Sequence, residues 1–205
     1  MPPPLNVFGL SGSLRGASFN TAALRAAAEL APEGMAVAVA TLHGIPNFDA
    51  DVEAAGLPPE VGRLREAVAA ANALLIATPE YNWSIPGVLK NALDWASRGG
   101  DGSPLRGKPA AILGAGGRSG TVRAQAHLRE ILRHNRVRVV GWPEVLIDAA
   151  ETRFDAAGKL TDERFRGQIR RLLEALAEEA LRTAEAPRAR TGPETLRRCR
   201  RRERT

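Results

Sequence analysis

The stretch LNVFGLSGSLRGASFN, residues 5–20, decides the fold. Residues 5–10 form an apolar run typical of a strand, and a helix-period segment begins near Ser18. Between them, residues 11–20 place serines, an arginine and two glycines in one strand-to-helix connection. The free N–H groups and the positive dipole end of the helix would point back at this connection. The stretch is therefore typical of a loop that binds a monophosphate.

The residue types of this loop suit an anion. Ser13 and Ser18 can donate hydroxyl hydrogen bonds, Arg15 can add a charge-assisted one, and the glycines let the backbone approach closely. The loop is not the Walker pattern, because no Gly-Lys-Ser/Thr follows, and it lacks the three spaced glycines of the dinucleotide fingerprint. The alternative interpretation is an ordinary turn in which Ser18 or Asn20 only caps the helix.

Strand and helix patterns alternate along the rest of the chain, which is the signature of a parallel α/β sheet. Helix-period segments cover residues 18–30, 59–71, 86–97, 121–134 and 162–183, and further apolar runs cover 35–42, 73–78, 110–114 and 137–147. Five strands alternating with five helices predict a three-layer α/β sandwich. Periodicity does not distinguish the flavodoxin-like strand order from the Rossmann order.

Composition favours one cytoplasmic domain. The chain has 205 residues, 44% of them hydrophobic, with no apolar run of membrane-spanning length and no signal-peptide pattern. Its single cysteine, Cys199, excludes an intrachain disulfide and fits a reducing compartment. Because His43, His127 and His134 show no ligand spacing, we expect no bound metal and expect these side chains to be solvated or capping.

The net charge of +6 is concentrated at the C-terminus. Residues 187–205 hold eight arginines and two glutamates, which leaves residues 1–186 balanced. We therefore expect a folded domain over residues 1–186 and a basic, disordered tail over residues 187–205. Such a tail can contact nucleic acid or anionic lipid through phosphates, or it is a solvated extension with only non-specific affinity.

Two more connections are expected at the same sheet edge, where ligands of parallel sheets bind. Residues 78–87 place Tyr81 and Trp83 between two prolines, and these flat rings with polar neighbours suit an aromatic ligand. A proline-rich corner with packing aromatics explains them equally. Residues 114–120 are rich in glycine, so their backbone can approach a ligand from another side.

Two motifs together are more specific than either one. The first is GSLR at residues 12–15, followed by Ser18 and Asn20, and the second is PEYN at 79–82, leading into SIPGVLKNALDW at 84–95. The chain resembles the NAD(P)H-dependent FMN reductases of flavodoxin-like fold, a group that includes quinone, azo-dye and chromate reductases. The similarity extends in order and spacing over residues 5–147.

The resemblance implies a five-stranded parallel sheet of order 2-1-3-4-5 and one FMN per chain, with NADPH or NADH as electron donor. It assigns to the FMN phosphate Ser13, Arg15, Ser18, Phe19 and Asn20. It assigns to the isoalloxazine ring Pro79, Glu80, Tyr81 and Asn82, with Gly116 and Gly117 near its other edge. No catalytic side chain is implied, because FMN carries the chemistry.

Two positions depart from the pattern of the family. Trp83 stands where a smaller residue or a tyrosine is more common, and it is therefore a candidate for the substrate pocket. Ala115 stands where a serine is common, which removes one side-chain contact to the flavin. The larger side chain of Trp83 bears on the range of acceptors that fit beside the flavin.

The implied activity is that of an oxidoreductase: ping-pong transfer of hydride from NAD(P)H to FMN, then two-electron reduction of a small-molecule acceptor such as a quinone, an azo compound, chromate or free flavin. One alternative is a flavodoxin-type electron carrier, although carriers tend to be acidic and this core is neutral. Another is a redox-sensing binding protein that uses the basic tail.

The resemblance also implies a homodimer or homotetramer whose flavin sites are completed by a neighbouring subunit. Arg123 and Glu144 are candidates for an ion pair between subunits. Alternatively, they are ordinary surface charges worth less than about 1 kcal/mol.

Overall fold

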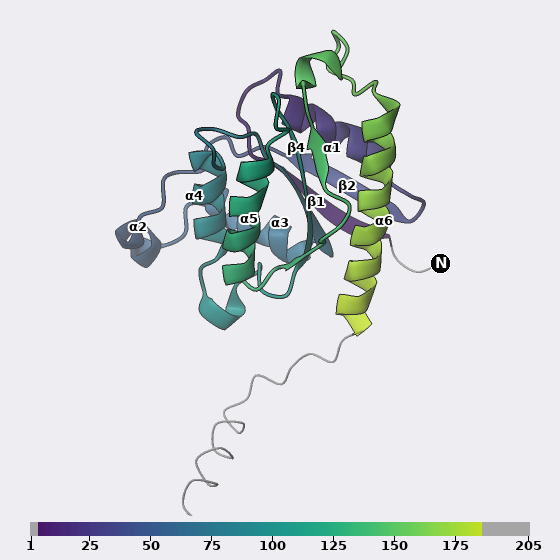
Figure 1. Cartoon of the computed structure of the whole chain (residues 1–205). Coiled ribbons are helices and arrows are strands. Elements are labelled where there is room, and N and C mark those ends of the chain that lie inside the picture. Colours follow the sequence, from purple (N-terminus) through teal and green to yellow (C-terminus); the bar gives the residue numbers. More distant parts are fainter. Residues whose placement is uncertain (1–3, 186–205) are drawn as a thin grey trace, which may run out of the picture.

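A parallel β-sheet runs through the centre of the structure, a computed structural model that describes residues 4–185 (Figure 1). Its strands are β1 (Leu5–Ser11), β2 (Met35–Ala40), β3 (Ala73–Ala77), β4 (Pro109–Ala115), β5 (Arg138–Val139) and β6 (Val145–Ile147). All pairings are parallel, in the order β2-β1-β3-β4-β5, and β6 also pairs with β4. The predicted flavodoxin-like order 2-1-3-4-5 is confirmed.

Two short strands share the fifth position, where a single strand over residues 137–147 was predicted. β5 pairs with Pro109 and Ala110 at the start of β4, whereas β6 pairs with the last three residues of β4. Trp142 and Pro143 lie between the two strands, Trp142 is 78% exposed, and proline has no N–H for the ladder. As a result, β6 alone continues the sheet beside β4 at its carboxyl edge.

The helices are α1 (Phe19–Glu29), α2 (Ala50–Ala55), α3 (Pro59–Ala70), α4 (Gly87–Ala96), α5 (Val122–His134) and α6 (Glu163–Glu185), with short 3-10 turns at Gly100–Gly102 and Ala150–Thr152. Five of them match the predicted segments closely. Helix α2 was not predicted. It projects from the body of the molecule and buries no side chain, so it leaves no apolar period in the sequence (Figure 1).

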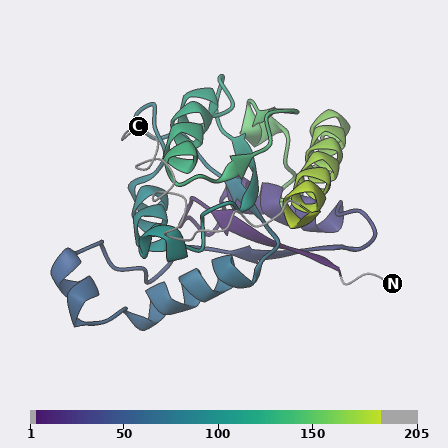
Figure 2. The ribbon, with the colours of Figure 1, turned by 90° about the horizontal axis from the view of Figure 1, so that it is seen from below.

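Helices cover both faces of the sheet, α1 and α6 on one face and α3, α4 and α5 on the other (Figure 2). Strand β3 shows why its sequence is continuously apolar. Ala73, Leu75 and Ala77 belong to the core beneath α1 and α6, while Leu74 and Ile76 belong to the opposite core. Within the described residues, every helix is too short or too polar to cross a bilayer.

The crossovers place helix ends at opposite edges of the sheet. Helices α1, α4 and α5 follow β1, β3 and β4, so their N-termini lie at the carboxyl edge of the sheet. Their C-termini, and that of α3, lie at the amino edge. The three connections selected from the sequence therefore meet at one edge, together with the start of α1 and of α5.

Candidate functional site

The connection after β1 presents free backbone donors at the start of α1. The Gly12 N–H donates to the Ala77 carbonyl at 2.8 Å, which fixes the loop against the end of β3. Farther along, the N–H groups of residues 16–20 have no acceptor among residues 4–185. Because α1 begins at Phe19, these donors coincide with the positive end of its dipole. The loop thus has the geometry of an anion site.

Two buried serines contribute to this loop. Ser18 Oγ accepts a hydrogen bond from the Thr21 N–H at 3.3 Å, so Ser18 is the N-cap of α1, and Ser13 Oγ accepts from the Arg15 N–H at 3.3 Å. Both hydroxyls act as acceptors in these contacts, and neither donates to another described residue. Capping the helix and donating to an anion are therefore compatible roles.

A cation lies beside these donors. Arg15 is exposed, and its guanidinium carbon lies 5.4 Å from the centre of the Phe19 ring. No carboxylate of the described chain forms an ion pair with it. Phe19 in turn packs on Phe154, with ring centres 5.1 Å apart. The charge of Arg15 is therefore available to a ligand at the start of α1.

The side chain of Asn20, a residue that the resemblance assigns to the phosphate, binds the end of β4. Its Nδ2 donates to the Ala115 carbonyl at 2.9 Å, and its Oδ1 accepts from the Ala115 N–H at 2.9 Å. The side chain is buried and joins α1 to the end of β4. Only the backbone N–H of Asn20 remains free for an anion.

The connection after β3 forms a tight two-residue turn. Tyr81 and Ser84 exchange backbone hydrogen bonds of 2.9 and 3.0 Å. Asn82 and Trp83 between them have φ angles of 48° and 66°, so both occupy the left-handed region. Asparagine tolerates this region, whereas a tryptophan there is strained by about 1–2 kcal/mol. Strained backbone of this kind gathers at functional sites.

Glu80 faces α5. Its carboxylate accepts from the backbone N–H groups of Arg123 and Ala124 at 2.9 and 3.2 Å, and from Arg123 Nη1 at 3.1 Å. Burial raises the pKa of the Glu80 carboxyl, but the hydrogen bonds from Ala124 and Arg123 and the charge of Arg123 outweigh it, so the pKa lies below its ordinary value. Glu80 caps α5, and only its backbone is left for a ring.

The tip of the turn is held by the same arginine. The Arg123 guanidinium carbon lies 4.4 Å from the centre of the Trp83 ring, within the range of a cation–π contact. Trp83 is 67% exposed. Glu80 is the ion-pair partner of Arg123 in its own chain, and Glu144 lies 3.7 Å from Arg129. The suggested contact between Arg123 and Glu144 of different subunits stays a prediction.

The connection after β4 supplies open backbone. A Cβ on Gly117 would meet no atom within 4 Å, whereas a Cβ on Gly114 would lie 1.9 Å from Thr121 Oγ1 and 2.6 Å from the Thr78 carbonyl. Gly114 therefore lets β3, β4 and the start of α5 approach closely. The sequence predicts a glycine-rich loop here, but it does not distinguish the packed Gly114 from the open Gly117.

Beside the turn after β3, a groove of about 480 Å³ lies between α4 and α5. It is lined by Ser84, Ile85, Gly87, Lys90, His127, Glu130 and Ile131. His127 Nδ1 lies 3.0 Å from Ser84 Oγ, so this histidine contacts the turn. Across residues 4–185, no three His, Cys, Asp or Glu side chains gather as a set of metal ligands.

Comparison with known proteins identifies the family. The family model described as NADPH-dependent FMN reductase matches residues 5–152. The chain is 52% identical over 177 residues to the NAD(P)H-dependent FMN reductase PA1204 of Pseudomonas aeruginosa, covering 86% of this chain and 95% of that protein. This chain belongs to the NADPH-dependent FMN reductase family.

Two further matches agree with this assignment. The 2-hydroxy-1,4-benzoquinone reductase of a Burkholderia species is 40% identical over 175 residues, covering 84% of this chain and 94% of that protein. Among solved structures, the flavoenzyme FerB, an NAD(P)H:(acceptor) oxidoreductase from Paracoccus denitrificans, matches with a TM-score of 0.77 and 30% identity over 87% of this chain and 98% of its own.

The residues at the carboxyl edge fit FMN. The free N–H groups of residues 16–20, two serine hydroxyls and an arginine with no ion-pair partner in the described chain have the hydrogen-bond donors and the charge that suit a single phosphate. Pro79, the turn at residues 81–84 and the open Gly117 supply the apolar and backbone surfaces that a planar ring requires. The protein is an oxidoreductase that uses FMN as cofactor and NAD(P)H as co-substrate.

Proposed function

We propose that the protein is a quinone reductase in which NAD(P)H and the acceptor use one surface in turn. When bound, FMN supplies the two-electron hydride chemistry. The observation that carries the proposal is the meeting of one phosphate site and one exposed aromatic turn at a single sheet edge. The 2-hydroxy-1,4-benzoquinone reductase of Burkholderia, similar over most of its length, supports a quinone-like acceptor.

The roles of this chain's residues follow from their partners. Arg15, the hydroxyls of Ser13 and Ser18, and the N–H groups of Phe19 and Asn20 bind the phosphate. At the ring, Pro79 and the backbone of residues 80–82 lie on one side, and the backbone of residues 116–117 lies at the other edge. Trp83 limits the space left to the nicotinamide and the acceptor.

Steady-state kinetics test the shared surface. With NADPH and a benzoquinone varied together, a shared surface gives parallel double-reciprocal lines, whereas intersecting lines would contradict it.

The absorption spectrum of the purified protein, with the cofactor released by heat and identified, tests whether the bound cofactor is FMN. Rapid reduction by NADPH in a stopped-flow experiment separates a reductase from a flavodoxin-type carrier, which NADPH does not reduce.

Other expectations stay predictions. Azo compounds, chromate and free flavin are predicted as further acceptors, and the cytoplasm as location. We also propose a homodimer or homotetramer, supported by the exposed Tyr81 and Val122 beside the site, and sedimentation tests it. The basic tail at residues 187–205 lies outside the described residues, so its expected disorder and its affinity for nucleic acid are open to a heparin-binding test at physiological salt.

A further inference from the structure

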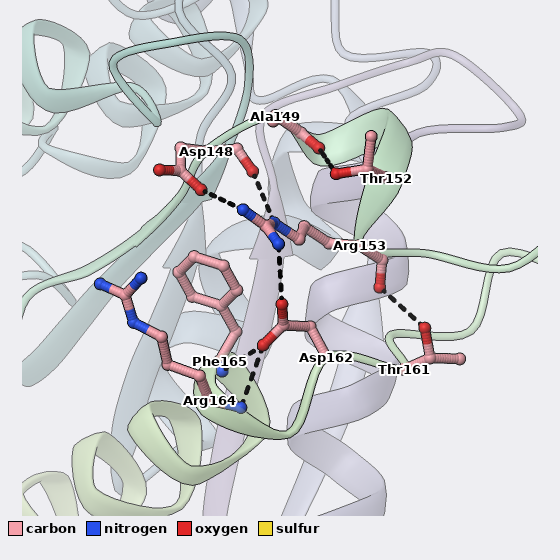
Figure 3. Close-up of polar contacts among 8 residues, drawn as sticks. All are labelled: Asp148, Ala149, Thr152, Arg153, Thr161, Asp162, Arg164 and Phe165. Atoms are coloured by element: carbon pink, nitrogen blue, oxygen red, sulfur yellow. Dashed lines mark hydrogen bonds and ion pairs between the residues drawn. The ribbon is translucent and has the colours of Figure 1, made fainter.

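A polar cluster orders the segment between β6 and α6 (Figure 3). Arg153 Nη2 lies 3.2 Å from Asp148 Oδ1, and its Nη1 lies 3.1 Å from Asp162 Oδ2. Asp162 Oδ1 also accepts from the N–H groups of Arg164 and Phe165 at 3.0 and 3.3 Å, which caps the start of α6. The planar guanidinium therefore ties the two ends of residues 148–162 together, and we call this segment the brace.

Further contacts fix the brace in place. The Arg153 carbonyl accepts from both the N–H and the hydroxyl of Thr161, at 3.0 and 3.3 Å. Thr152 Oγ1 donates to the Ala149 carbonyl at 2.9 Å (Figure 3). Phe154 is buried and packs on Phe19 at the start of α1. The brace thus contacts the predicted phosphate loop, residues 11–20, on one side and is closed internally by Arg153.

The brace also sets the direction of two peptide units after β4. The Ala150 N–H donates to the Gly116 carbonyl at 3.0 Å, and the Ala149 N–H donates to the Gly117 carbonyl at 3.1 Å. In a trans peptide unit, the carbonyl and the following N–H point in opposite directions. The N–H groups of Gly117 and Arg118 therefore point away from the brace, and neither has an acceptor among the described residues.

We propose that Arg153 is a positioning residue for the flavin. By closing the brace, it holds the Gly117 and Arg118 N–H groups in the direction in which they can donate to the edge of the ring. This inference rests on the proposed function, which places residues 116–117 at that edge. Donors fixed there favour the form of the ring that carries more negative charge, so they bind reduced FMN more tightly than oxidised FMN.

The test compares Arg153→Met with a matched control, Arg129→Met. The side chain of Arg129 is 25% exposed and that of Arg153 is 31% exposed. Arg129 also makes an ion pair and a hydrogen bond to a backbone carbonyl, that of Val140. It lies on α5, outside the brace. Apoprotein is titrated with FMN, and the midpoint potential of the bound FMN is measured. Unfolding in urea reports the stability of each variant.

We expect Arg153→Met to bind oxidised FMN about tenfold more weakly. A further loss of about tenfold for reduced FMN makes the two-electron potential about 30 mV more negative. Arg129→Met should keep both values of the wild type while losing similar stability. If both variants keep the affinity and the potential of the wild type, Arg153 only stabilises the fold and the inference is wrong.

A second variant covers the case in which Arg153→Met does not fold. Asp148→Asn keeps an oxygen acceptor but removes the charge that Arg153 Nη2 meets. We expect faster hydrogen exchange at the Ala149 and Ala150 amides together with weaker FMN binding. Faster exchange with unchanged FMN affinity would overturn the inference. Failure of the wild-type apoprotein to bind FMN would instead contradict the proposed function.

Discussion

The two edges of the sheet differ in whether the backbone groups at the helix ends have hydrogen-bond partners. At the amino edge, cationic side chains donate hydrogen bonds to the carbonyls at the helix C-termini. Lys108 Nζ donates to the Ala69 and Ala71 carbonyls at the end of α3, at 3.1 and 2.5 Å. Arg65 Nη1 donates to the Trp95 carbonyl at the end of α4, at 2.9 Å. At the carboxyl edge, the N–H groups of residues 16–20 have no partner in the described chain. Free N–H groups at a helix start favour an anion, so we expect a ligand to bind at this open end.

The carboxyl edge is not uniform, and the contrast within it is informative. The start of α5 is occupied by the Glu80 carboxylate, whereas the start of α1 has only the neutral cap of Ser18 and the cation of Arg15 nearby. An anion at α5 would meet a negative charge. We therefore expect the phosphate at α1, and the predictions below test this division from the largest effect to the smallest.

Gly114→Ala should have the largest effect. The new methyl group would lie 2.6 Å from the Thr78 carbonyl, which is backbone and cannot move freely, so we expect a loss of about 3 kcal/mol in the free energy of unfolding. Gly117→Ala is the control in the same loop, because its methyl group would meet no atom within 4 Å. Urea unfolding measures both. Equal stability of the two variants would contradict the close approach of β3, β4 and α5.

Arg15→Ala should weaken FMN binding by about 1.5–3 kcal/mol, because it removes a charge-assisted contact to the phosphate. Since Arg15 is exposed, the free energy of unfolding of the apoprotein should stay unchanged. Arg25→Ala, an exposed arginine later on α1, is the control. Calorimetric titration with FMN distinguishes them, and an Arg15→Ala variant with wild-type affinity would place this arginine away from the phosphate.

Trp83→Gly should alter selectivity more than stability. Glycine relieves the left-handed strain at this turn position, and this gain offsets the lost contact with Arg123, which is worth about 0.5–1 kcal/mol at an exposed site. We expect unchanged FMN content and oligomeric state, and a change of about tenfold, or 1.4 kcal/mol, in the ratio of kcat/KM between a three-ring and a one-ring quinone. A loosened oligomer with all activities lowered together would place Trp83 in an interface.

The sequence predicted the fold better than the roles of individual side chains. Strands such as β3 are covered on both faces, so an apolar run suffices to locate them. The break between β5 and β6 was missed because an apolar run does not encode which residues pair. The free backbone donors at the start of α1 were predicted because the strand end, the serines and the helix start lie within residues 5–20.

Long-range partners explain what the sequence could not predict. Asn20 is bound by Ala115, 95 residues away, and Glu80 by Arg123, 43 residues away. Asparagine and glutamate side chains can each bind a ligand or another part of the chain. Only the folded structure shows which of the two contacts is made. The role of the brace was not predicted either, because the Ala149 and Ala150 N–H groups bind the Gly117 and Gly116 carbonyls, which lie far away in the sequence and belong to no shared motif.

Glu80→Gln should cost about 1 kcal/mol of stability at pH 7, the typical value of a helix cap. The Glu80 pKa is lowered in the folded state, so its stabilisation is present above the ordinary value of 4.5 and is lost as the pH falls through the folded pKa. The difference in unfolding free energy between wild type and variant should therefore shrink below pH 4.5. A difference that is constant from pH 7 to pH 3 would show that the carboxylate charge is not what caps α5.

Lys108→Met probes the closed amino edge, and its effect should be the smallest. Removing the ammonium group leaves the Ala69 and Ala71 carbonyls without this donor, but it also removes the desolvation of a half-buried charge, so we expect a net loss below about 1 kcal/mol.

The small effect of Lys108→Met on stability should also depend on pH. Burial lowers the pKa of the Lys108 amine, so between the folded pKa and the ordinary value of 10.5 the unfolded chain binds more protons and the wild type gains stability as the pH rises. The advantage of the wild type over Lys108→Met should therefore grow as the pH approaches 10.5. FMN affinity should not change, because the amine lies at the opposite edge from the phosphate loop. A weakened FMN affinity in this variant would show that the two edges are coupled. It would contradict the view that the amino edge only stabilises the fold while the carboxyl edge binds FMN.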